Sequence, residues 1–318
     1  MVHNNFKALA EKANHLRKAF FLITAAVLIL GCLACFLGPV LMPGSAWISD
    51  LGYEKGEVYP LTFNWDDERS CPQIPVRAGG SEYAPLFDTG CGIGMLLTNV
   101  VEDSIPHTFL EQTEALNRDG SHQGWIKRVV VEELDIFGDT YKSVKANIAD
   151  WTMFASQPFD GNVGLAYFQK RTVTLDYAGH KIAVSRNPID YTSLDPDKYT
   201  VLSLYRSTSR GQGDLLFFPV ELDGKLAMAY LDTGKNYSYV YDPECGLSIM
   251  ERPPSGLKNV SLKLGGKEIM LKDVAQVNDL PQAQGLPYPT MVELNSDQIW
   301  KCKLIVTIDL IDQKIIFR

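Results

Sequence analysis

Concentrated positive charge is what this 318-residue sequence most clearly lacks. Its 30 lysines and arginines are outnumbered by 38 aspartates and glutamates, the net charge is −8, and no long basic cluster occurs. Because phosphate backbones are bound through a concentrated basic face, nucleic acid is not expected as a partner.

Metal and nucleotide signatures are also missing. The five histidines and six cysteines show no zinc-ligand spacing. Glycines at 90, 92 and 94 imitate a dinucleotide fingerprint, but the surrounding βαβ unit that such a fingerprint needs is absent from the pattern. The sequence therefore predicts no metal and no cofactor. What it does contain is an ordinary balance of 46% hydrophobic and 21% charged residues, enough to bury a substantial core.

One long apolar run departs from this average. The residues from Ala19 to Met42 carry no charge, and as a helix they would cover about 36 Å, against about 30 Å for the hydrocarbon core of a bilayer. Residues 19–42 are therefore predicted to be a single-pass transmembrane anchor. Basic residues precede it at Lys7, Lys12, Arg17 and Lys18. Residues 1–18 are thus expected in the cytoplasm and the rest of the chain outside it, in a periplasmic or extracellular space.

Two alternatives to an uncleaved anchor stay open. A signal peptide would be removed, although its apolar stretch is usually only about 7 to 15 residues long. Cys32, in the context Ile29-Leu30-Gly31-Cys32, would instead carry a lipid, although the apolar run continues well beyond it. Either alternative still exports the remainder of the chain.

The exported part holds four cysteines, Cys71, Cys91, Cys245 and Cys302. An even number permits two disulfides, but four cysteines allow three connectivities that a sequence alone does not resolve, and buried free thiols are equally compatible. Cys245 and Cys302 lie in the same half of the chain. A disulfide in that half is therefore predicted to join these two.

The remainder of the chain has a β pattern. Residues 43–70 mix glycine, proline and acidic residues without sustained periodicity and are predicted to be a spacer. From Cys71 onward, short β-branched and aromatic runs, such as 125–131 and 172–184, alternate with turn residues, and helical periodicity is scarce. This pattern is typical of an all-β fold.

An internal repeat organises these strands. The segment from Ile74 to Gly90 aligns without a gap on the segment from Phe218 to Gly234, and each reads as a strand, a glycine-containing turn, a second strand and then Asp-Thr-Gly. The segment that begins at Val173 likewise matches the one that begins at Val306. The chain is therefore predicted to contain two similar β lobes, at 71–186 and 214–318, joined by a connection at 187–213.

With two Asp-Thr-Gly tripeptides in register, the chain resembles the aspartic proteases of the pepsin and retropepsin clan. The resemblance covers roughly 71–318 and includes Phe159 to Phe168, which is similar to the hydrophobic-hydrophobic-Gly segment that braces the active loop in that family. It implies a bilobal acid-protease fold without metal. In that fold Asp88 and Asp232 are catalytic, supported by loop residues that lock the loops together and permit their tight turns: Thr89, Gly90, Thr233 and Gly234.

The family also has a β-hairpin flap over the cleft. The resemblance places its tip in 117–127, with Gly120, Gly124 and Trp125 as the residues that close over substrate. The second unit has a shorter interval after its Asp-Thr-Gly and holds Pro253-Pro254, so no flap is expected there.

Paired carboxyls suit hydrolysis of an amide. One group must take a proton from water while another gives a proton to the carbonyl oxygen, and two like charges about 3 Å apart do not easily ionise together, so the pair shares one proton. The prediction is a membrane-anchored aspartic endopeptidase acting on a peptide or protein substrate, with a monomeric catalytic part. The intact duplication argues against a homodimer of retropepsin type.

Two departures from the family pattern keep an alternative open. The residue after Asp-Thr-Gly is usually small, whereas here it is Cys91 in one loop and Lys235 in the other, and an ammonium near the pair would favour the ionised form. The second unit also has Leu294-Asn295-Ser296 where the first has the bracing Gly164-Leu165. The alternative is a non-catalytic peptide-binding or sensor module with the same fold.

Overall fold

The computed structural model describes residues 45–318 except 68–69, 93, 117–120, 152–158, 210–212, 214, 248–255 and 281. The chain divides into two compact units, Met1–Trp47 and Ile48–Arg318. The predicted anchor at 19–42 lies outside the described residues. Among the residues that are described, no helix is long and apolar enough to cross a bilayer.

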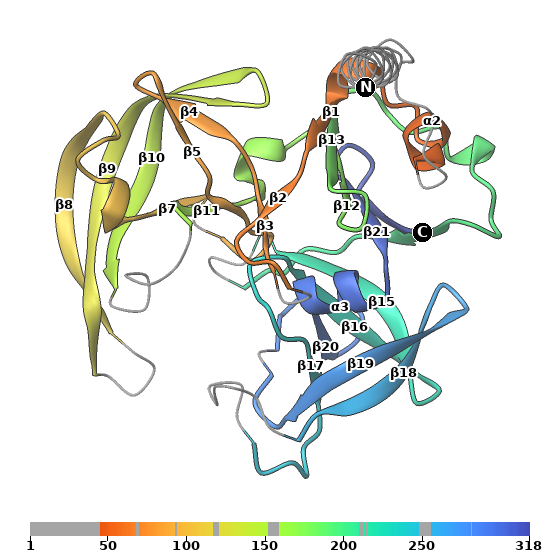
Figure 1. Ribbon diagram of the computed structural model, residues 1–318. Coiled ribbons are helices and arrows are strands. Elements are labelled where there is room, and N and C mark those ends of the chain that lie inside the picture. Colours follow the sequence, from red (N-terminus) through yellow and green to blue (C-terminus); the bar gives the residue numbers. More distant parts are fainter. Residues whose placement is uncertain are drawn as a thin grey trace, which may run out of the picture. The chain divides into compact units, whose positions relative to one another are not determined.

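The unit from Ile48 to Arg318 is mostly β, which confirms the predicted fold class at that level (Figure 1). Its largest sheet has the order β2-β3-β6-β11-β7-β10-β9-β4-β5, and β8 pairs with β9. These strands are β2 (Thr62–Phe63), β3 (Pro72–Gln73), β4 (Val76–Ala78), β5 (Ser81–Tyr83), β6 (Leu86–Phe87), β7 (Met95–Thr98), β8 (His107–Leu116), β9 (His122–Ile136), β10 (Asp139–Trp151) and β11 (Gly161–Val163).

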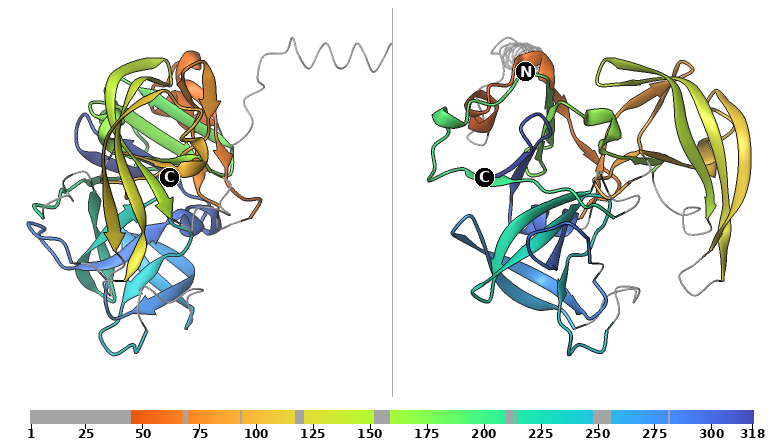
Figure 2. Two further views of the ribbon diagram at one scale, coloured as in Figure 1. Left: turned by 90° about the vertical axis from the view of Figure 1, so that its left-hand side faces the viewer. Right: turned by 180° about the vertical axis from the view of Figure 1, so that it is seen from behind.

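The second half of the chain forms a closed barrel in the order β15-β16-β20-β17-β19-β18. In Figures 1 and 2 this barrel and the large sheet are separate bodies. The barrel strands are β15 (Leu216–Leu222), β16 (Lys225–Asp232), β17 (Tyr239–Tyr241), β18 (Lys258–Leu264), β19 (Lys267–Val277) and β20 (Thr290–Asn295).

A six-stranded sheet of order β1-β13-β12-β21-β22-β14 joins the two halves. Its strands are β1 (Val58–Pro60), β12 (Thr172–Asp176), β13 (Lys181–Ser185), β14 (Thr200–Ser203), β21 (Ile305–Asp309) and β22 (Lys314–Phe317). β12 pairs antiparallel with β21 so that Thr174 faces Thr307, and their hydroxyl oxygens are 2.7 Å apart. These residues are equivalent in the repeat, so an approximate twofold axis passes between them.

Helices are few and short in the described part of the chain. They are α2 (Ala46–Asp50) and α3 (Ser296–Lys301), with the 3₁₀ turns η1 (Lys55–Glu57), η2 (Asn99–Val101), η4 (Leu165–Phe168) and η5 (Tyr191–Ser193). Of these, η4 and α3 follow β11 and β20 directly, and each therefore begins next to an Asp-Thr-Gly loop.

Both hairpins of the predicted repeat are present, and their turn chemistry explains their match. β4 and β5 are joined by Gly79 and Gly80, and β15 and β16 by Asp223 and Gly224. All four residues have positive φ, between 50° and 83°. Two-residue turns of this kind match the twist of paired strands but require left-handed backbone, which glycine and aspartate tolerate. The gapless alignment therefore reflects one hairpin geometry used twice.

The structure differs from the sequence prediction at two boundaries. The segment 43–70 is more than a spacer, because β1 pairs with β13 and β2 pairs with β3 at sheet edges. The connection at 187–213 contains β14, which pairs with β22. Both β1 and β2 are only two or three residues long, too short to show alternation, and Pro60 is compatible with an edge position.

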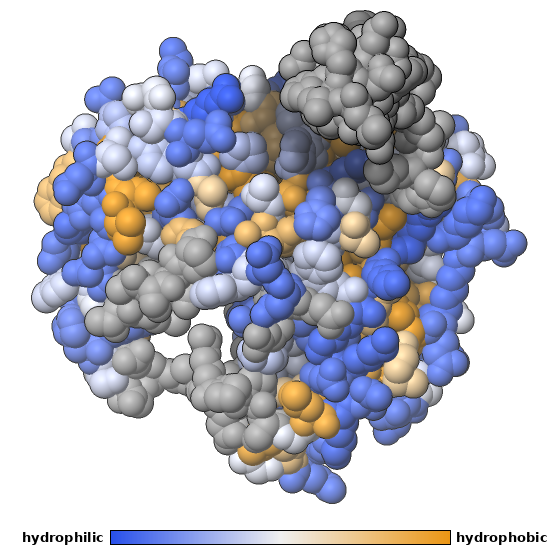
Figure 3. Space-filling model, viewed as in Figure 1, coloured by the Kyte–Doolittle hydropathy of each residue, from blue (hydrophilic) through white to orange (hydrophobic). Residues whose placement is uncertain are grey.

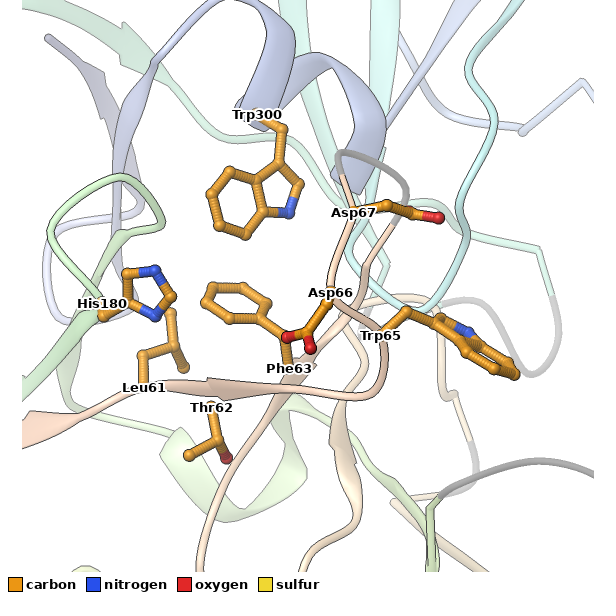
Figure 4. A pocket seen from close by; sticks show the side chains of 8 residues that line it. All are labelled: Leu61, Thr62, Phe63, Trp65, Asp66, Asp67, His180 and Trp300. Atoms are coloured by element: carbon orange, nitrogen blue, oxygen red, sulfur yellow. The ribbon is translucent and has the colours of Figure 1, made fainter.

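The core follows the alternation of the strands. Strand β12 is buried at all five positions, because neighbouring elements cover both of its faces, whereas β8 is almost wholly exposed. The face drawn in Figure 3 is mostly hydrophilic, with apolar residues gathered into small patches. An aromatic cluster packs where the large sheet meets α3: the Phe63 ring lies between His180 and Trp300, with centroid distances of 5.3 and 4.6 Å (Figure 4).

Candidate active site

The two Asp-Thr-Gly loops interlock through their threonines. The Thr89 backbone N–H donates to Thr233 Oγ1 at 3.1 Å, and the Thr233 N–H donates to Thr89 Oγ1 at 3.0 Å. Each hydroxyl in turn donates to the other half of the chain, Thr89 to the Leu231 carbonyl at 2.8 Å and Thr233 to the Phe87 carbonyl at 2.6 Å. Both threonines are buried. This closed, reciprocal set of bonds holds residues from the ends of β6 and β16 together.

Each aspartate lies against the glycine of the opposite loop. A Cβ on Gly90 would overlap the Asp232 carboxyl, and a Cβ on Gly234 would overlap the Asp88 carboxyl. Within its own loop, Gly90 N–H donates to Asp88 Oδ1 at 2.8 Å and Gly234 N–H donates to Asp232 Oδ1 at 3.0 Å. Neither glycine is among those with positive φ. Close approach of the carboxyls, rather than a tight turn, is therefore what requires glycine here.

The strands beside the two loops add two residues that the sequence prediction did not assign, Asn162 and Glu293. β11 pairs in parallel with β6, so that Asn162 stands beside Leu86, and its Nδ2 donates to Asp88 Oδ2. β20 pairs in parallel with β16, so that Glu293 stands beside Tyr230. Leu86 and Tyr230 each precede an aspartate by two residues. Asn162 and Glu293 are therefore equivalent positions with different side chains.

Lys235 connects Glu293 to the second aspartate. Its Nζ lies 2.7 Å from Glu293 Oε1 and 3.4 Å from Asp232 Oδ2. Glu293 and Asp232 are both buried, while the Lys235 side chain is 42% exposed. Lys235 makes no ion pair with Asp88 within 4 Å, both residues being in the described part of the chain. The Lys235 ammonium thus forms an ion pair with Asp232 and not with Asp88.

The electrostatics of the two halves differ accordingly. Burial, and then the charge of Asp232, raise the pKa of Asp88 to about 7, against the opposing hydrogen bonds from Gly90 and Asn162. Burial raises the pKa of Glu293, opposed by Lys235. The carboxyls of Asp232 and Glu293 raise the pKa of Lys235, although burial acts in the other direction. Lys235 therefore stays charged at neutral pH, and Asp88 holds a proton up to about pH 7.

The segments that brace the loops differ between the halves. In the first, Asp88 N–H donates to the Val163 carbonyl at 3.0 Å, and a Cβ on Gly164 would overlap the Cys91 carbonyl. In the second, Asn295 takes the place of Gly164. Ser296 N–H donates to the Lys235 carbonyl at 3.1 Å, and Ser296 Oγ donates to the Thr233 carbonyl at 2.8 Å. The second loop is thus braced by polar side chains instead of glycine.

The two predicted flap residues that the structure describes, Gly124 and Trp125, take no part in these contacts. β8 and β9 form a hairpin, but Gly120 lies outside the described residues. Gly124 and Trp125 belong to β9 and pair with β10, and Trp125 packs its 41% exposed side chain against His122. The structure brings together the six loop residues, and no hydrogen bond joins Gly124 or Trp125 to them in the described part of the chain.

The predicted Cys245–Cys302 disulfide is wrong. All four cysteines at 71, 91, 245 and 302 are free thiols. Cys245 Sγ donates to the Gln276 carbonyl and Cys302 Sγ to the Met270 carbonyl. These two acceptors lie on β19, six residues apart, a span of roughly 20 Å in a strand, whereas a disulfide needs Cα atoms within about 7 Å. No cluster that could hold a metal occurs among the described residues.

Two cavities in the described part of the chain have different settings. One of about 170 Å³ lies beside Asp232 and includes Tyr230, Lys235 and Glu293 in its lining. Another of about 540 Å³ lies over the Phe63 cluster, with Asp66 and His180 in its lining (Figure 4). Neither Asp88 nor Asp232 is among the residues that line these two cavities.

Comparisons with known proteins add little to this picture. No protein-family model and no curated protein matches the chain. A similar solved structure is the crystal structure of an aspartic proteinase from Irpex lacteus, at 9% sequence identity and a TM-score of 0.49, covering 82% of this chain and 96% of that one. The functional argument therefore rests on the residues of this chain.

Proposed function

We propose that the chain is an aspartic endopeptidase that hydrolyses peptide bonds with Asp88 and Asp232 acting on one water molecule. The observation that carries the proposal is the reciprocal bonding of Thr89 and Thr233, which holds two Asp-Thr-Gly loops from the two halves face to face. The placement of each carboxyl against the glycine of the opposite loop also supports the proposal, because it brings the two carboxyls close enough to act as one unit.

The proposed reaction begins with a water between the two carboxyls. Asp232, as the carboxylate, takes a proton from the water, and the water oxygen bonds to the carbonyl carbon. At the same time Asp88 gives its proton to the carbonyl oxygen. The resulting gem-diol then collapses: the C–N bond breaks, the nitrogen receives the proton held by Asp232, and a hydroxyl proton returns to Asp88. Both aspartates end as they began.

The surroundings of the pair support this division of roles. The Lys235 ammonium lies 3.4 Å from Asp232, the residue that the mechanism uses as the carboxylate, while the raised pKa of Asp88 favours a proton on Asp88. Such an enzyme would work at weakly acidic to neutral pH, because Asp88 loses its proton as the pH rises through about 7. That range suits an exported enzyme that is not confined to an acidic compartment.

The remaining parts of the proposal concern setting and substrate. Residues 19–42 anchor the chain in a membrane, with the catalytic part periplasmic or extracellular. Both loops come from one chain, so the catalytic part acts as a monomer. The substrate is a peptide or protein segment in extended form, and the β8–β9 hairpin, with Gly120, Gly124 and Trp125, is the candidate flap.

A non-catalytic peptide-binding or sensor module is the second candidate. The departure that favours it is Lys235, since an ammonium bridging both carboxyls would neutralise the pair. Its ion pairs run instead to Asp232 and Glu293, and among the described residues none joins it to Asp88, which favours the enzyme.

Incubation of the purified full-length chain, in detergent micelles, with a diverse peptide library tests the proposal. Mass spectrometry should detect internal cleavage that is absent with Asp232→Asn. Asp223→Asn makes the same chemical change on an exposed hairpin turn and should cleave as wild type does. Binding of peptides by wild type with no cleavage at any pH from 3 to 8 would support the sensor module instead.

A further inference from the structure

The cavity of about 540 Å³ is formed by segments that are far apart in the sequence (Figure 4). Phe63 belongs to β2, and Asp66 to the loop that follows it. His180 comes from the turn between β12 and β13, and Trp300 from α3. Small-molecule sites in proteins have volumes of about 300–1,000 Å³. The cavity is therefore large enough to hold a ligand group.

One wall of this cavity is aromatic and firmly held. The ring of Phe63 lies 4.6 Å from that of Trp300 and 5.3 Å from that of His180, and the last two are 6.0 Å apart, measured between centroids. Trp300 Nε1 donates to the Ser70 carbonyl at 3.1 Å. The fully buried ring of Tyr177 packs against both Phe63 and Trp300. Because aromatic faces carry negative partial charge, such a wall attracts cations.

The charged side chains of the lining are carboxylates. Asp66 and Asp67 are both exposed, and no lysine or arginine of the described chain lines the cavity. The backbone of Asp67 is fixed to Ser70, whose N–H donates to the Asp67 carbonyl at 3.1 Å. The Asp66 side chain makes no hydrogen bond or ion pair with any described residue. Aromatic rings and an uncompensated carboxylate thus line one cavity, and both favour a positively charged ligand.

The combination favours one kind of cation. A lysine ammonium is compact and strongly hydrated, so it gains less from an aromatic wall. A quaternary ammonium suits aromatic faces but has no N–H to donate to a carboxylate. A guanidinium is planar and weakly hydrated, stacks on rings and donates to carboxylates in a fork geometry. It is the cation that both parts of the lining can bind.

We propose that this cavity binds an arginine side chain carried by a peptide or protein. The guanidinium plane lies against the rings of Phe63 and Trp300, and its N–H groups donate to Asp66. A protein cavity of about 150 Å³ is known to hold benzene, so one of about 540 Å³ leaves room for the stem of the side chain and the main chain beside it. The inference stands apart from the proposed protease function, because neither Asp88 nor Asp232 lines the cavity.

Calorimetry on the full-length chain in detergent micelles, at pH 8, tests the assignment. The probes are the N-acetyl amides of arginine, citrulline and lysine, and choline. Citrulline has the shape of arginine but carries a neutral urea, so arginine should bind about tenfold more tightly, the effect of one hydrogen bond between charged groups. Lysine and choline should bind more weakly than arginine. Equal binding of arginine and citrulline, tighter binding of lysine or choline, or no binding of arginine overturns the proposal.

A capped pentapeptide, with arginine flanked by two glycines on each side, tests the source of the group. It should bind at least as tightly as the arginine amide. Weaker binding of the pentapeptide would mean that the cavity takes free guanidino compounds, which overturns the assignment to a peptide.

Two variants test the residues. Asp66→Asn should lower the affinity for arginine about tenfold and leave that for citrulline unchanged. Asp223→Asn, the same change on the exposed β15–β16 turn, should bind as wild type does. Phe63→Leu removes a ring from the wall and should lower the affinity for arginine about threefold, with folding checked by thermal melting. Unchanged arginine affinity in Asp66→Asn overturns the proposal whatever the stability of Phe63→Leu, because Asp66 is exposed.

Discussion

Asn162 and Glu293 occupy equivalent positions beside the two Asp-Thr-Gly loops, yet they support the aspartates in different ways. Asn162 donates a hydrogen bond directly to Asp88, whereas Glu293 acts on Asp232 through the ammonium of Lys235. A neutral donor and a cation beside two otherwise symmetric carboxyls make the pair unequal. Lys235 thus acts on one side of the pair only, and this difference leads to the first prediction.

Lys235→Met should move the acidic limb of the pH profile of kcat/KM to higher pH. Removing the ammonium makes negative charge on Asp232 less favourable, so a higher pH is needed to form the reactive carboxylate. Lys263→Met is the matched control, because it removes a more exposed lysine from an ion pair with Glu221 on the barrel surface. An acidic limb at the same pH in Lys235→Met and wild type would mean that the ammonium does not act on Asp232.

The raised pKa of Asp88 predicts how stability depends on pH. The carboxyl titrates near 3.8 when unfolded and at about 7 when folded, so the fold favours its protonated form. This stabilisation is fully present below about pH 4 and is lost as the pH rises through 7. Asp88→Asn should therefore raise the melting temperature at pH 8 and flatten its decline between pH 4 and 8. Because the pKa of Glu293 is also raised, part of the decline should remain in this variant. A variant less stable than wild type at pH 8 would contradict the raised pKa.

Thr89→Val should destabilise the protein and lower its activity. The change keeps the side-chain shape but removes the bond to the Leu231 carbonyl and leaves the buried Thr233 N–H without its partner, at about 1–3 kcal/mol for a buried group left unsatisfied. Chemical denaturation measures the loss. Thr62→Val, which removes an exposed hydroxyl with a long 3.4 Å bond, should change the free energy of unfolding very little. Equal stabilities of the two variants would argue against the interlock.

Gly90→Ala should abolish cleavage and lower stability, since its methyl group would overlap the Asp232 carboxyl and force the loops apart. Gly56→Ala places a methyl group in open space on a short helical turn and should change neither stability nor activity. Melting temperatures and cleavage rates of the two variants, side by side, measure the effect. Full activity in Gly90→Ala would mean that the carboxyls are not packed against the opposite glycines.

The sequence predicted those features that repeat. The sequence predicts Asp88 and Asp232 as a pair because each follows the same hairpin, with Gly79-Gly80 or Asp223-Gly224 at its turn. The mostly β composition followed from alternation and turn residues in the same way. Such features are local, so a pattern in the chain carries them.

Features that depend on spatial neighbours were missed or wrong. Lys235 was noticed, but its partner Glu293 is 58 residues away and becomes a neighbour only through the parallel pairing of β16 with β20. The predicted disulfide is wrong because the Cys245 and Cys302 thiols donate to carbonyls that are six residues apart on β19. Their presence in the same half of the chain does not reveal this separation. Strand β1 escaped prediction because its pairing with β13, not its own three residues, makes it a strand.

The central claim is that Asp88 and Asp232 act as one catalytic unit. The most direct measurement is kcat/KM for a cleaved peptide in wild type, Asp88→Asn, Asp232→Asn and the double variant, with folding checked by thermal melting. An amide cannot exchange the shared proton, so each single variant should lose cleavage by a factor of about 10³ or more, and the double variant should be no worse than either single one. Near-normal cleavage in either single variant, with the fold intact, would contradict the account.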